Sequence, residues 1–388
     1  MAYQPQIIII GAGIVGLSTA YALLVEGKYR VRILEQAVVN HQRSTSSSIS
    51  RLLRFEYGTD AFYARMVKLS LEHWRELERY TRYTLYTPTG VLSLGKEGEE
   101  TLREQEIIRG LGLTSERLSV QKCHQRFPQF DLKDYAFLTY NTEGGILHAS
   151  TCLSALKRAV LDLGGEIIET SPVARIEHDN PYRAPRVHLA TGEEMYADRV
   201  VVAAGPWIHS LLGSLHLPVE VTRQYILYFA GLSPANFGTG VFPAFMERNL
   251  YGFPIHKGSH GWLKATTHQF GRPVDPNAPV QIEEQVIEQI THDLYALIPA
   301  LRTAELAHIE ACMYDVTPDE DFILDYMPDD ARIVFATGLS GHGFKFGPLL
   351  GHLLSTLISG KTPEVPTGRF RLARFSHQQS HPQAISVA

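Results

Sequence analysis

The chain has 388 residues, of which 44% are hydrophobic and 20% charged, and its net charge is −5 at pH 7. This composition is typical of an ordinary soluble globular protein, and the length predicts two domains with a sizeable core. The weak negative charge gives no reason to expect binding to nucleic acid or to an anionic membrane, and no apolar run approaches the roughly 20 residues that span a bilayer.

The chain ends and the cysteines bear on targeting and redox state. The apolar run 7–10 starts too early for a signal peptide and lacks a basic segment before it. The final Ser386-Val387-Ala388 differs from the peroxisomal Ser-Lys-Leu signal. The three cysteines, Cys123, Cys152 and Cys312, are too few for a disulfide framework and lack metal-ligand spacing. We therefore expect a cytoplasmic protein that holds no metal.

The first part of the chain has the pattern of a dinucleotide-binding unit. A strand-like run, 7–10, leads directly into the glycine turn 11–16, Gly-Ala-Gly-Ile-Val-Gly, and an alanine-rich helix. A second strand, 31–34, ends on Glu35. Strand, glycine turn, helix, strand and acid in this order form the fingerprint of a βαβ dinucleotide site. The N-terminus of the helix offers N–H groups and partial positive charge to phosphates.

Each residue type in this fingerprint has a physical reason. Gly11 permits the tight turn, Gly13 lets a pyrophosphate approach the backbone, and Gly16 lets helix and strand pack closely. Glu35 lies 19 residues after Gly16, where its carboxylate can accept hydrogen bonds from both ribose hydroxyls. Because an acid here disfavours a 2′-phosphate, we predict FAD or NAD rather than NADP. The alternative is a purely structural glycine turn.

A serine-rich stretch, 44–50, follows soon after the second strand and leads into Arg51-Leu52-Leu53-Arg54. Serine runs are ordinarily flexible loops. In this position the stretch is expected close to the cofactor, where small side chains and many N–H groups would let it wrap a ligand.

The middle of the chain alternates helices and strands. Hydrophobic periodicity predicts helices over 61–80, 97–110, 149–163 (ending at Gly164-Gly165) and 282–297. Strands are predicted over 86–94 with a turn at 89–90, over 166–177 paired as a hairpin with 186–189, and over 199–203. The runs 219–230, 251–254 and 262–267 predict an antiparallel sheet.

A second glycine segment lies near the C-terminus. The strand 332–336 is followed by Gly338-Leu339-Ser340-Gly341-His342-Gly343 and by an apolar helix over 348–359. A helix beginning after Gly343 could direct its N-terminus at a second electron-rich group, which in flavoproteins is the N1–C2=O edge of the flavin. This segment favours FAD over NAD, although it could also be a simple loop between strand and helix.

Several motifs, in order along nearly the whole chain, carry a resemblance to one enzyme family. They are Gly11 to Gly16, Ser50 to Arg54 with Tyr57-Gly58, Ala204-Gly205-Pro206-Trp207, Tyr251-Gly252-Phe253-Pro254, Leu263-Lys264, Cys312-Met313-Tyr314 with Thr317-Pro318-Asp319, and Gly341-His342-Gly343-Phe344-Lys345-Phe346. On these motifs the chain resembles the FAD-dependent amine oxidases of the monomeric sarcosine oxidase, N-methyltryptophan oxidase and pipecolate oxidase group.

The pattern of elements and the resemblance together predict an α/β fold with a D-amino-acid-oxidase-like, two-domain architecture. A discontinuous, Rossmann-like FAD-binding domain is expected over 1–85, 145–215 and 305–388. An inserted substrate domain, built on an antiparallel sheet, is expected over 86–144 and 216–304.

The resemblance implies specific roles near the flavin. It implies that Cys312 carries FAD through a thioether to the flavin 8α-methyl, for which nearby positive charge would help to form the thiolate. It implies that Lys264 lies over the flavin face near N5 and activates oxygen, because a fixed ammonium stabilises the anion that oxygen becomes on gaining an electron. Arg51 corresponds to a basic residue beside the flavin.

The resemblance also implies a substrate with a free carboxylate. Arg54 and Lys345 match the positions that bind this group, Arg through a forked pair of donors and Lys as a point charge. The expected catalytic residues are Lys264, Arg51, His268 and Tyr314, and Tyr251 is expected to join Arg54 and Lys345 in binding the substrate. The expected cofactor contacts are Gly11, Gly13, Ile14, Gly16, Glu35, Ser44, Ser47, Ser50, Arg51, Val173, Gly205, Trp207, Cys312, Gly338, Gly341, Gly343 and Lys345.

Two departures limit how far the resemblance extends. Sarcosine oxidase has a histidine where this chain has Ser47, and the stretch between Met246 and Tyr251 is shorter here. The second stretch borders the substrate pocket, so we do not assume that the substrate is sarcosine.

The sequence thus predicts oxidation of the C–N bond of an amino acid, most directly a secondary amine such as an N-methyl or cyclic amino acid. Hydride transfer to flavin N5 would give an imine, and oxygen would be reduced to hydrogen peroxide by a monomeric enzyme. Alternatives are a dehydrogenase of the same fold, an oxidase of a primary or glycated amino acid, and a non-catalytic flavin- or NAD-binding module.

Overall fold

The computed structural model describes residues 3–96, 99–180 and 182–376. The chain divides into two compact units, and each is described by itself. The first unit comprises residues 1–41, 156–221 and 314–388, and the second comprises 42–155 and 222–313. Residues 42–85, 145–155 and 305–313 of the second unit are predicted in the FAD-binding domain, and residues 216–221 of the first unit are predicted in the substrate domain. Which residues make up the functional domains stays a prediction.

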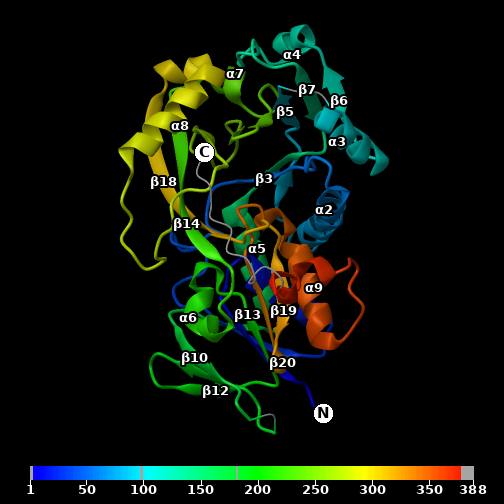
Figure 1. Cartoon of the computed structure of the whole chain (residues 1–388), viewed down its shortest axis with the longest axis vertical. Helices are drawn as coiled ribbons and strands as arrows, with labels where there is room; N and C mark the ends of the chain where they lie inside the picture. The colour runs from blue at the N-terminus through cyan, green and yellow to red at the C-terminus, as the bar shows by residue number, and fades with distance from the viewer. Residues whose placement is uncertain (1–2, 97–98, 181, 377–388) are drawn as a thin grey trace. The chain divides into compact units, whose positions relative to one another are not determined.

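The first unit is built on a six-stranded sheet with the strand order β19-β20-β13-β1-β2-β9; its strands β13, β19 and β20 are labelled in Figure 1. Its strands are β1 Gln6–Ile10, β2 Arg30–Leu34, β9 Glu166–Ile168, β13 Arg199–Val202, β19 Ile323–Met327 and β20 Asp330–Thr337. All neighbouring pairs are parallel except β19 with β20. Parallel sheets are buried on both faces and therefore read as continuous apolar runs, as residues 7–10 of β1 do, each at most 5% exposed.

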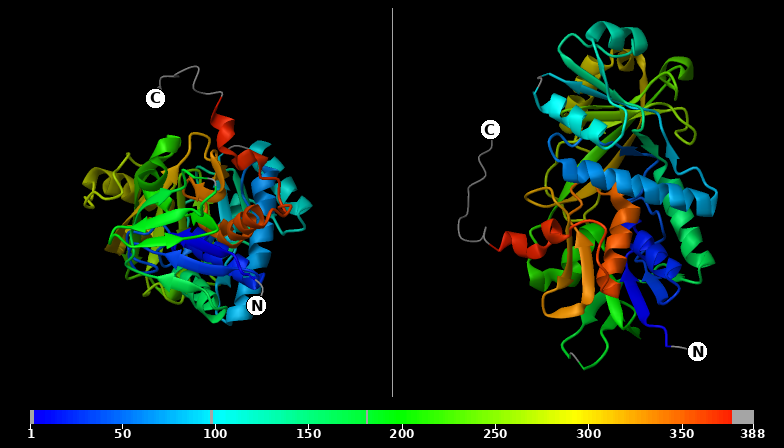
Figure 2. Two further views of the ribbon diagram at one scale, coloured as in Figure 1. Left: turned by 90° about the horizontal axis from the view of Figure 1, so that it is seen from below. Right: turned by 90° about the vertical axis from the view of Figure 1, so that its right-hand side faces the viewer.

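The helices of the first unit cover this sheet. They are α1 Ile14–Val25, α6 Ile208–Leu212, α9 Gly347–Ser359 and the part of α5 Ala149–Asp162 that follows residue 155, together with the short 3-10 turns η1 Gly205–Trp207, η2 Gly213–Leu215, η4 Phe344–Phe346, η5 Gly368–Phe370 and η6 Leu372–Phe375. Helix α9 packs along α1, as the right-hand view of Figure 2 shows in orange and dark blue. The packing is close because Gly351 lies where any Cβ would come within 2.3 Å of the Ser18 backbone.

One predicted hairpin is different in the structure. Residues 166–177 form two separate strands rather than one. Strand β9 joins the parallel sheet beside β2, whereas β10 Val173–Glu177 pairs with β11 Arg186–Leu189, which in turn pairs with β12 Glu194–Tyr196. The hairpin prediction is therefore right for 173–177 and wrong for 166–168. The short β9 has no alternating pattern that would separate it from its neighbour.

The second unit is built on an eight-stranded sheet with the order β18-β14-β17-β16-β15-β5-β7-β6. Its strands are β5 Val91–Gly95, β6 Glu116–Leu118, β7 Phe137–Asn141, β14 Glu220–Ala230, β15 Ala244–Glu247, β16 Leu250–Phe253, β17 Leu263–Thr267 and β18 Glu305–Val316. The predicted antiparallel arrangement of β14, β16 and β17 is confirmed. Strand β15 runs parallel to β5, and the predicted 86–94 strand is divided at Gly90.

A small sheet and several helices complete the second unit. The sheet has the order β3-β8-β4, with β3 Arg51–Leu53, β4 Tyr86–Thr87 and β8 Gly145–Leu147. The helices are α2 Ala61–Thr81, α3 Glu99–Gly110, α4 Val120–Arg126, α7 Pro234–Phe237 and α8 Glu284–Leu297, with the 3-10 turn η3 Pro299–Thr303. Two residues of the predicted helix 97–110 (97 and 98) lie outside the described residues.

The parallel sheet with its covering helices and the mainly antiparallel eight-stranded sheet confirm the predicted α/β class. Within the described ranges, no helix has both the length and the apolar character needed to cross a bilayer.

Candidate functional site

The glycine turn of the first unit folds as the fingerprint requires. Gly11 follows β1 with a φ of +102°, and its N–H donates to the Leu34 carbonyl at 2.8 Å. A Cβ on Gly11 would lie 2.3 Å from the Ala203 carbonyl oxygen, and a Cβ on Gly16 would lie 1.9 Å from that of Gly11. Only glycine therefore fits at both positions.

The first turn of helix α1 lacks a side-chain cap. Its N-cap is Gly13, whose side chain can cap nothing, and the first turn contains no acidic residue. A helix start normally satisfies its first N–H groups through a capping side chain, water or a ligand. This turn is accordingly suited to an anion such as a phosphate.

Glu35 lies beside this turn and is 6% exposed. One carboxylate oxygen accepts from the Ala12 N–H at 2.8 Å, and the other accepts from the Ala37 N–H at 2.9 Å. His41 Nε2 lies 3.8 Å from the second oxygen. An ionised carboxylate has about four acceptor positions, so the two oxygens keep capacity for two hydroxyl groups.

Other predicted cofactor contacts of the first unit lie on several segments. Gly205 and Trp207 form η1, with the Trp207 ring 6.2 Å from the His41 ring, and Val173 begins β10. None of these contacts with a cofactor is tested by the geometry, and they stay predictions.

The second glycine segment of the first unit follows β20. Gly338 and Gly341 have φ values of +66° and +72°, and a Cβ on Gly341 would lie 2.5 Å from the Tyr314 ring. Asp315 holds the turn, because its carboxylate accepts from the Gly338 N–H at 2.8 Å. The predicted helix after Gly343 begins as the 3-10 turn η4 and continues as α9 from Gly347.

Lys345 is in this 3-10 turn and is 4% exposed. Its Nζ donates to the His342 carbonyl at 2.9 Å. Lys345 and Tyr314 belong to the first unit, whereas Arg54, Tyr251 and His268 belong to the second. The joint binding of a carboxylate by Arg54 and Lys345 therefore stays a prediction.

In the second unit, Lys264 is on β17 and only 2% exposed. Its Nζ donates to Ser48 Oγ at 2.7 Å and to the Ser50 carbonyl at 2.6 Å. The Phe253 and Tyr228 rings flank it, with centroids 5.1 and 6.0 Å from Nζ. Burial and then the nearby Arg51 charge lower the pKa of Lys264 to about 7, against the opposing effects of Glu310 and Cys312.

Arg51 shapes the serine-rich loop that holds Lys264. Its guanidinium donates to the carbonyls of Thr45 and Ser47, both at 2.9 Å, and to that of Ser50 at 3.2 Å. The Ser44 carbonyl accepts from the Ser47 N–H, which tightens the same loop. Within the described part of the chain, the buried Ser50 hydroxyl has no hydrogen-bond partner. A buried polar group of this kind is normally satisfied, so a ligand group is expected beside it.

Cys312 is on β18 and is 8% exposed. Burial raises the pKa of its thiol to about 11, although Arg51 and Lys264 act in the opposite direction. All three cysteines are unpaired thiols. Among the described residues, no group of three or more His, Cys, Asp or Glu side chains could hold a metal ion.

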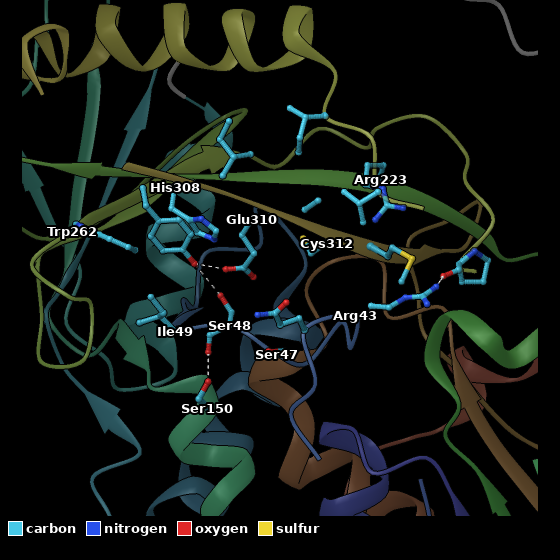
Figure 3. A pocket seen from close by; sticks show the side chains of 18 of the residues that line it. Arg43, Ser47, Ser48, Ile49, Ser150, Arg223, Trp262, His308, Glu310 and Cys312 are labelled. Atoms are coloured by element: carbon cyan, nitrogen blue, oxygen red, sulfur yellow. Dashed lines mark hydrogen bonds between the residues drawn. The ribbon is translucent and has the colours of Figure 1, made fainter. Parts of the chain in front are cut away.

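Cys312 lines a cavity of about 600 Å³ within the second unit (Figure 3). The cavity is bordered by the serine-rich loop and by β14 and β18, and it includes Ser47, Ser48, Tyr228, Glu310 and Arg223. Residues 308, 310 and 312 alternate along β18, so they share one face of that strand. The cavity thus collects a thiol, a carboxylate, a phenol and a guanidinium.

Tyr251 and His268 are brought together by the pairing of β16 and β17. Their rings lie 6.2 Å apart at 84°, and the His268 N–H donates to the Asn249 carbonyl. Arg54 stacks on Tyr57, with its guanidinium carbon 4.4 Å from the ring centroid.

Several residues of the candidate site were not predicted from the sequence. They are Ser48, Glu56, Tyr228, Glu310 and Asp315. One signal was available. The predicted antiparallel pair β14 and β17 places Tyr228 directly opposite Lys264, but this register depends on the sheet as a whole. Strand β18, which carries Glu310 and Cys312, was not predicted.

Glu56 lies two residues after Arg54 in the sequence and is 2% exposed. Its carboxylate accepts from the Phe55 N–H at 2.9 Å. Burial and then the nearby Glu104 carboxylate raise the pKa of Glu56 to about 7, against the effect of Arg54.

Comparisons with known proteins agree with this geometry. The family described as "DAO: FAD dependent oxidoreductase" matches residues 6–357. Peroxisomal sarcosine oxidase of Homo sapiens is 34% identical over 384 residues, covering 95% of each chain. N-methyl-L-tryptophan oxidase of Salmonella typhimurium is 30% identical over 384 residues, covering 96% of this chain and 99% of its own.

Solved structures share the fold. L-proline dehydrogenase from P. horikoshii superposes with a TM-score of 0.85 at 21% identity, covering 97% of this chain and 99% of its own. Glycine oxidase from Geobacillus kaustophilus has a TM-score of 0.80 at 19% identity, covering 96% and 99%. These likenesses confirm the predicted α/β, D-amino-acid-oxidase-like fold.

Because Glu56 is buried, we expect the free energy of unfolding of the protein to depend on pH. Its pKa is about 7 in the folded protein and 4.5 as the ordinary value, so the folded state binds more protons between these limits. The stability of the wild type therefore falls as pH rises through this window. The glutamine of Glu56→Gln cannot ionise. The free energy of unfolding of the variant minus that of the wild type should therefore increase by on the order of 3 kcal/mol from pH 4.5 to pH 8.

Urea unfolding of both proteins at pH 4.5, 6 and 8 measures this difference. Glu104→Gln serves as the matched variant, because loss of that charge should move the window to lower pH. A gap between Glu56→Gln and wild type that is constant across pH would contradict the prediction.

Proposed function

The chain belongs to the DAO family of FAD-dependent oxidoreductases, and from this premise we propose that it oxidises the C–N bond of an amino acid that carries a secondary amine. The observation that carries the proposal is the buried amine of Lys264, held by Ser48 and Ser50 in the same unit as Cys312. Two of its relatives are named for N-methyl amino acids, since sarcosine is N-methylglycine.

The residues of the chain fit FAD. The turn at 11–16 admits only glycine at two positions and starts a helix without a side-chain cap, which suits a pyrophosphate. Glu35 keeps acceptor capacity for a ribose, and the buried Ser50 hydroxyl lacks a partner within the described residues. When bound, FAD supplies the acceptor for the hydride that leaves the carbon beside the amine nitrogen.

The proposed substrate binding uses charge. Arg54 would donate a forked pair of hydrogen bonds to the substrate carboxylate, with Lys345 as a second cation. The amine must lose its proton before it can release a hydride from the neighbouring carbon. Positive charge and burial both favour the neutral amine, so cationic residues such as Arg51 would serve this step too. Tyr251, His268 and Tyr314 are proposed to shape the pocket.

Lys264 is proposed to act on oxygen. Oxygen becomes anionic when it gains its first electron, and a fixed ammonium in a dry site stabilises that charge far more than water would. With a pKa of about 7, Lys264 can hold a proton when an anion forms and release it afterwards. Hydrogen peroxide is the proposed product. A monomeric state and a cytoplasmic location are further proposals, the second of which rests on the few, unpaired cysteines.

We further propose that Cys312 bonds covalently to the flavin 8α-methyl. The raised thiol pKa means that the thiolate must be assisted, and Arg51 and Lys264 act in that direction. In the wild type, yellow colour should remain with the pellet after acid precipitation. In Cys312→Ser it should pass to the supernatant, while Cys123→Ser should behave like the wild type. Colour that stays in the supernatant of the wild type would overturn the covalent link but not FAD binding.

The substrate class is tested by flavin absorbance under nitrogen. N-methyl and cyclic amino acids should bleach the flavin band at least about 10-fold faster than the matching primary amino acids, and an N-methyl amine without a carboxylate should be the poorest. The band should return when air is admitted. Faster bleaching by primary amino acids would contradict the secondary-amine proposal, and a band that stays bleached in air would indicate a dehydrogenase.

A further inference from the structure

A continuous chain of hydrogen bonds leads away from Lys264. Lys264 Nζ donates to Ser48 Oγ at 2.7 Å, Ser48 Oγ lies 3.5 Å from Tyr228 Oη, and Tyr228 Oη donates to Glu310 Oε2 at 2.5 Å. Every group in this chain can both release and take up a proton. The last two contacts are the dashed lines beside Ser48 and Glu310 in Figure 3.

The eight-stranded sheet of the second unit holds most of these hydrogen-bonded groups in place. Lys264 is on β17, Tyr228 on β14 and Glu310 on β18, and these three strands are neighbours in the sheet. Tyr228 is the residue directly opposite Lys264 in the β14–β17 pairing. Ser48 is held in turn by the start of helix α5, because its carbonyl accepts from the Ser150 hydroxyl at 2.8 Å. Backbone pairing therefore sets the positions of Lys264, Tyr228 and Glu310, and the hydrogen bond to α5 sets that of Ser48.

The series of hydrogen bonds that starts at Lys264 ends at a cavity large enough for water. Ser48, Tyr228 and Glu310 all line the cavity of about 600 Å³, whereas Lys264 is 2% exposed. Tyr228 is itself only 1% exposed, and His308 beyond it is an exposed residue at the cavity. A cavity of this size can hold ordered water where polar groups such as Glu310, Tyr228 and Ser48 line it, so Glu310 can exchange protons there.

We propose that Ser48, Tyr228 and Glu310 form a proton relay between the cavity and the amine of Lys264. This inference rests on the proposed function, since it supplies the oxygen chemistry with protons. Conversion of O₂ to H₂O₂ consumes two electrons and two protons. A bound, reduced FAD would account for both electrons and one proton, and the relay supplies the second proton through Lys264. The amine is then neutral and is reprotonated from Glu310 through Tyr228 and Ser48.

The hydroxyl of Tyr228 has to pass the proton in a concerted way. Burial and then Glu310 raise the pKa of Tyr228 above its ordinary value, so a free tyrosinate is not formed. The hydrogen bonds reverse once Glu310 has taken up a proton and Lys264 has become neutral: Glu310 then donates to Tyr228 Oη, the hydroxyl proton moves on to Ser48 Oγ, and the serine proton moves to Lys264 Nζ. The hydroxyls of Tyr228 and Ser48 are thereby restored to their neutral form, and Glu310, left as a carboxylate, takes up the next proton from the cavity.

The charged groups around Lys264 set when it needs a proton. Arg51 from β3 lowers the pKa of Lys264, whereas Glu310 and Cys312 from β18 raise it. His256 follows β16; burial lowers its pKa to about 4, and Lys264 contributes in the same direction. Of these groups, Glu310 is the one that the hydrogen-bond chain connects to Lys264.

The first test reads the proton on Lys264 directly and needs no turnover. In holoprotein labelled with ¹³C at lysine Cε, the Lys264 signal is assigned through its loss in Lys264→Met and followed by NMR against pH. Replacement of the Glu310 carboxylate in Glu310→Gln should lower the midpoint of Lys264 below that of the wild type. An unchanged midpoint would overturn the proposed connection.

The second test separates the relay from the oxidase itself. Tyr228→Phe removes the central hydroxyl, and Tyr225→Phe is its matched control. Tyr225 is also a buried residue of β14 whose hydroxyl donates to a glutamate, Glu283, at 3.0 Å, but it lies outside the relay. Flavin reduction by substrate under nitrogen should be unchanged in both variants.

Reoxidation by oxygen should slow on the order of 10-fold or more in Tyr228→Phe alone, with a solvent isotope effect that differs from the wild type. Equal reoxidation rates and equal isotope effects in Tyr228→Phe and wild type would overturn the relay while leaving the oxidase intact. If the wild-type flavin is reduced but not reoxidised by oxygen, the proposed oxidase fails, and the NMR titration still tests whether Glu310 and Lys264 are connected.

Discussion

The amine of Lys264 is buried between the Phe253 and Tyr228 rings, and the loop and strands around it are arranged to satisfy its charge. The fall of its pKa from 10.5 to about 7 corresponds to on the order of 5 kcal/mol against the charged form. Two short hydrogen bonds, to Ser48 Oγ and the Ser50 carbonyl, offset only part of this. Near neutral pH this buried amine is therefore about as stable in its neutral form as in its charged form. A group that both takes up and releases a proton requires this condition.

The serine-rich loop links the two cations of this region. Arg51 donates to the carbonyls of Thr45, Ser47 and Ser50, and Lys264 donates to Ser50 and Ser48. The loop is therefore held by hydrogen bonds from both Arg51 and Lys264. Since both cations bond to the Ser50 carbonyl, loss of one side chain would alter the surroundings of the other. The small serines leave their backbone groups accessible to these donors. The same compactness explains why a loop of this composition can be ordered rather than flexible.

Much of the fold follows from local patterns in the sequence. The glycine turn at 11–16 was predictable because Gly11 and Gly16 meet backbone atoms that no Cβ could approach. The parallel strands were predictable because residues 7–10 form an uninterrupted apolar run. The antiparallel strands around Lys264 were also predictable from their composition.

The remainder depends on tertiary pairing that local patterns do not encode. Tyr228 is identified as the neighbour of Lys264 only by the register of β14 against β17. Glu310 belongs to β18, a strand in which charged and apolar residues are mixed, and its role appears only beside Tyr228. Glu56 reads as a surface acid in sequence, but packing buries it. Residues that act through a second residue are thus the ones that sequence reasoning missed.

The account depends most directly on Lys264 as the group that acts on oxygen. We would measure flavin reduction by an N-methyl amino acid under nitrogen, and then reoxidation by oxygen, in the wild type and in Lys264→Met. The account predicts similar reduction rates and a reoxidation rate that falls on the order of 10²-fold in the variant. Equal reoxidation rates in the two proteins would contradict it.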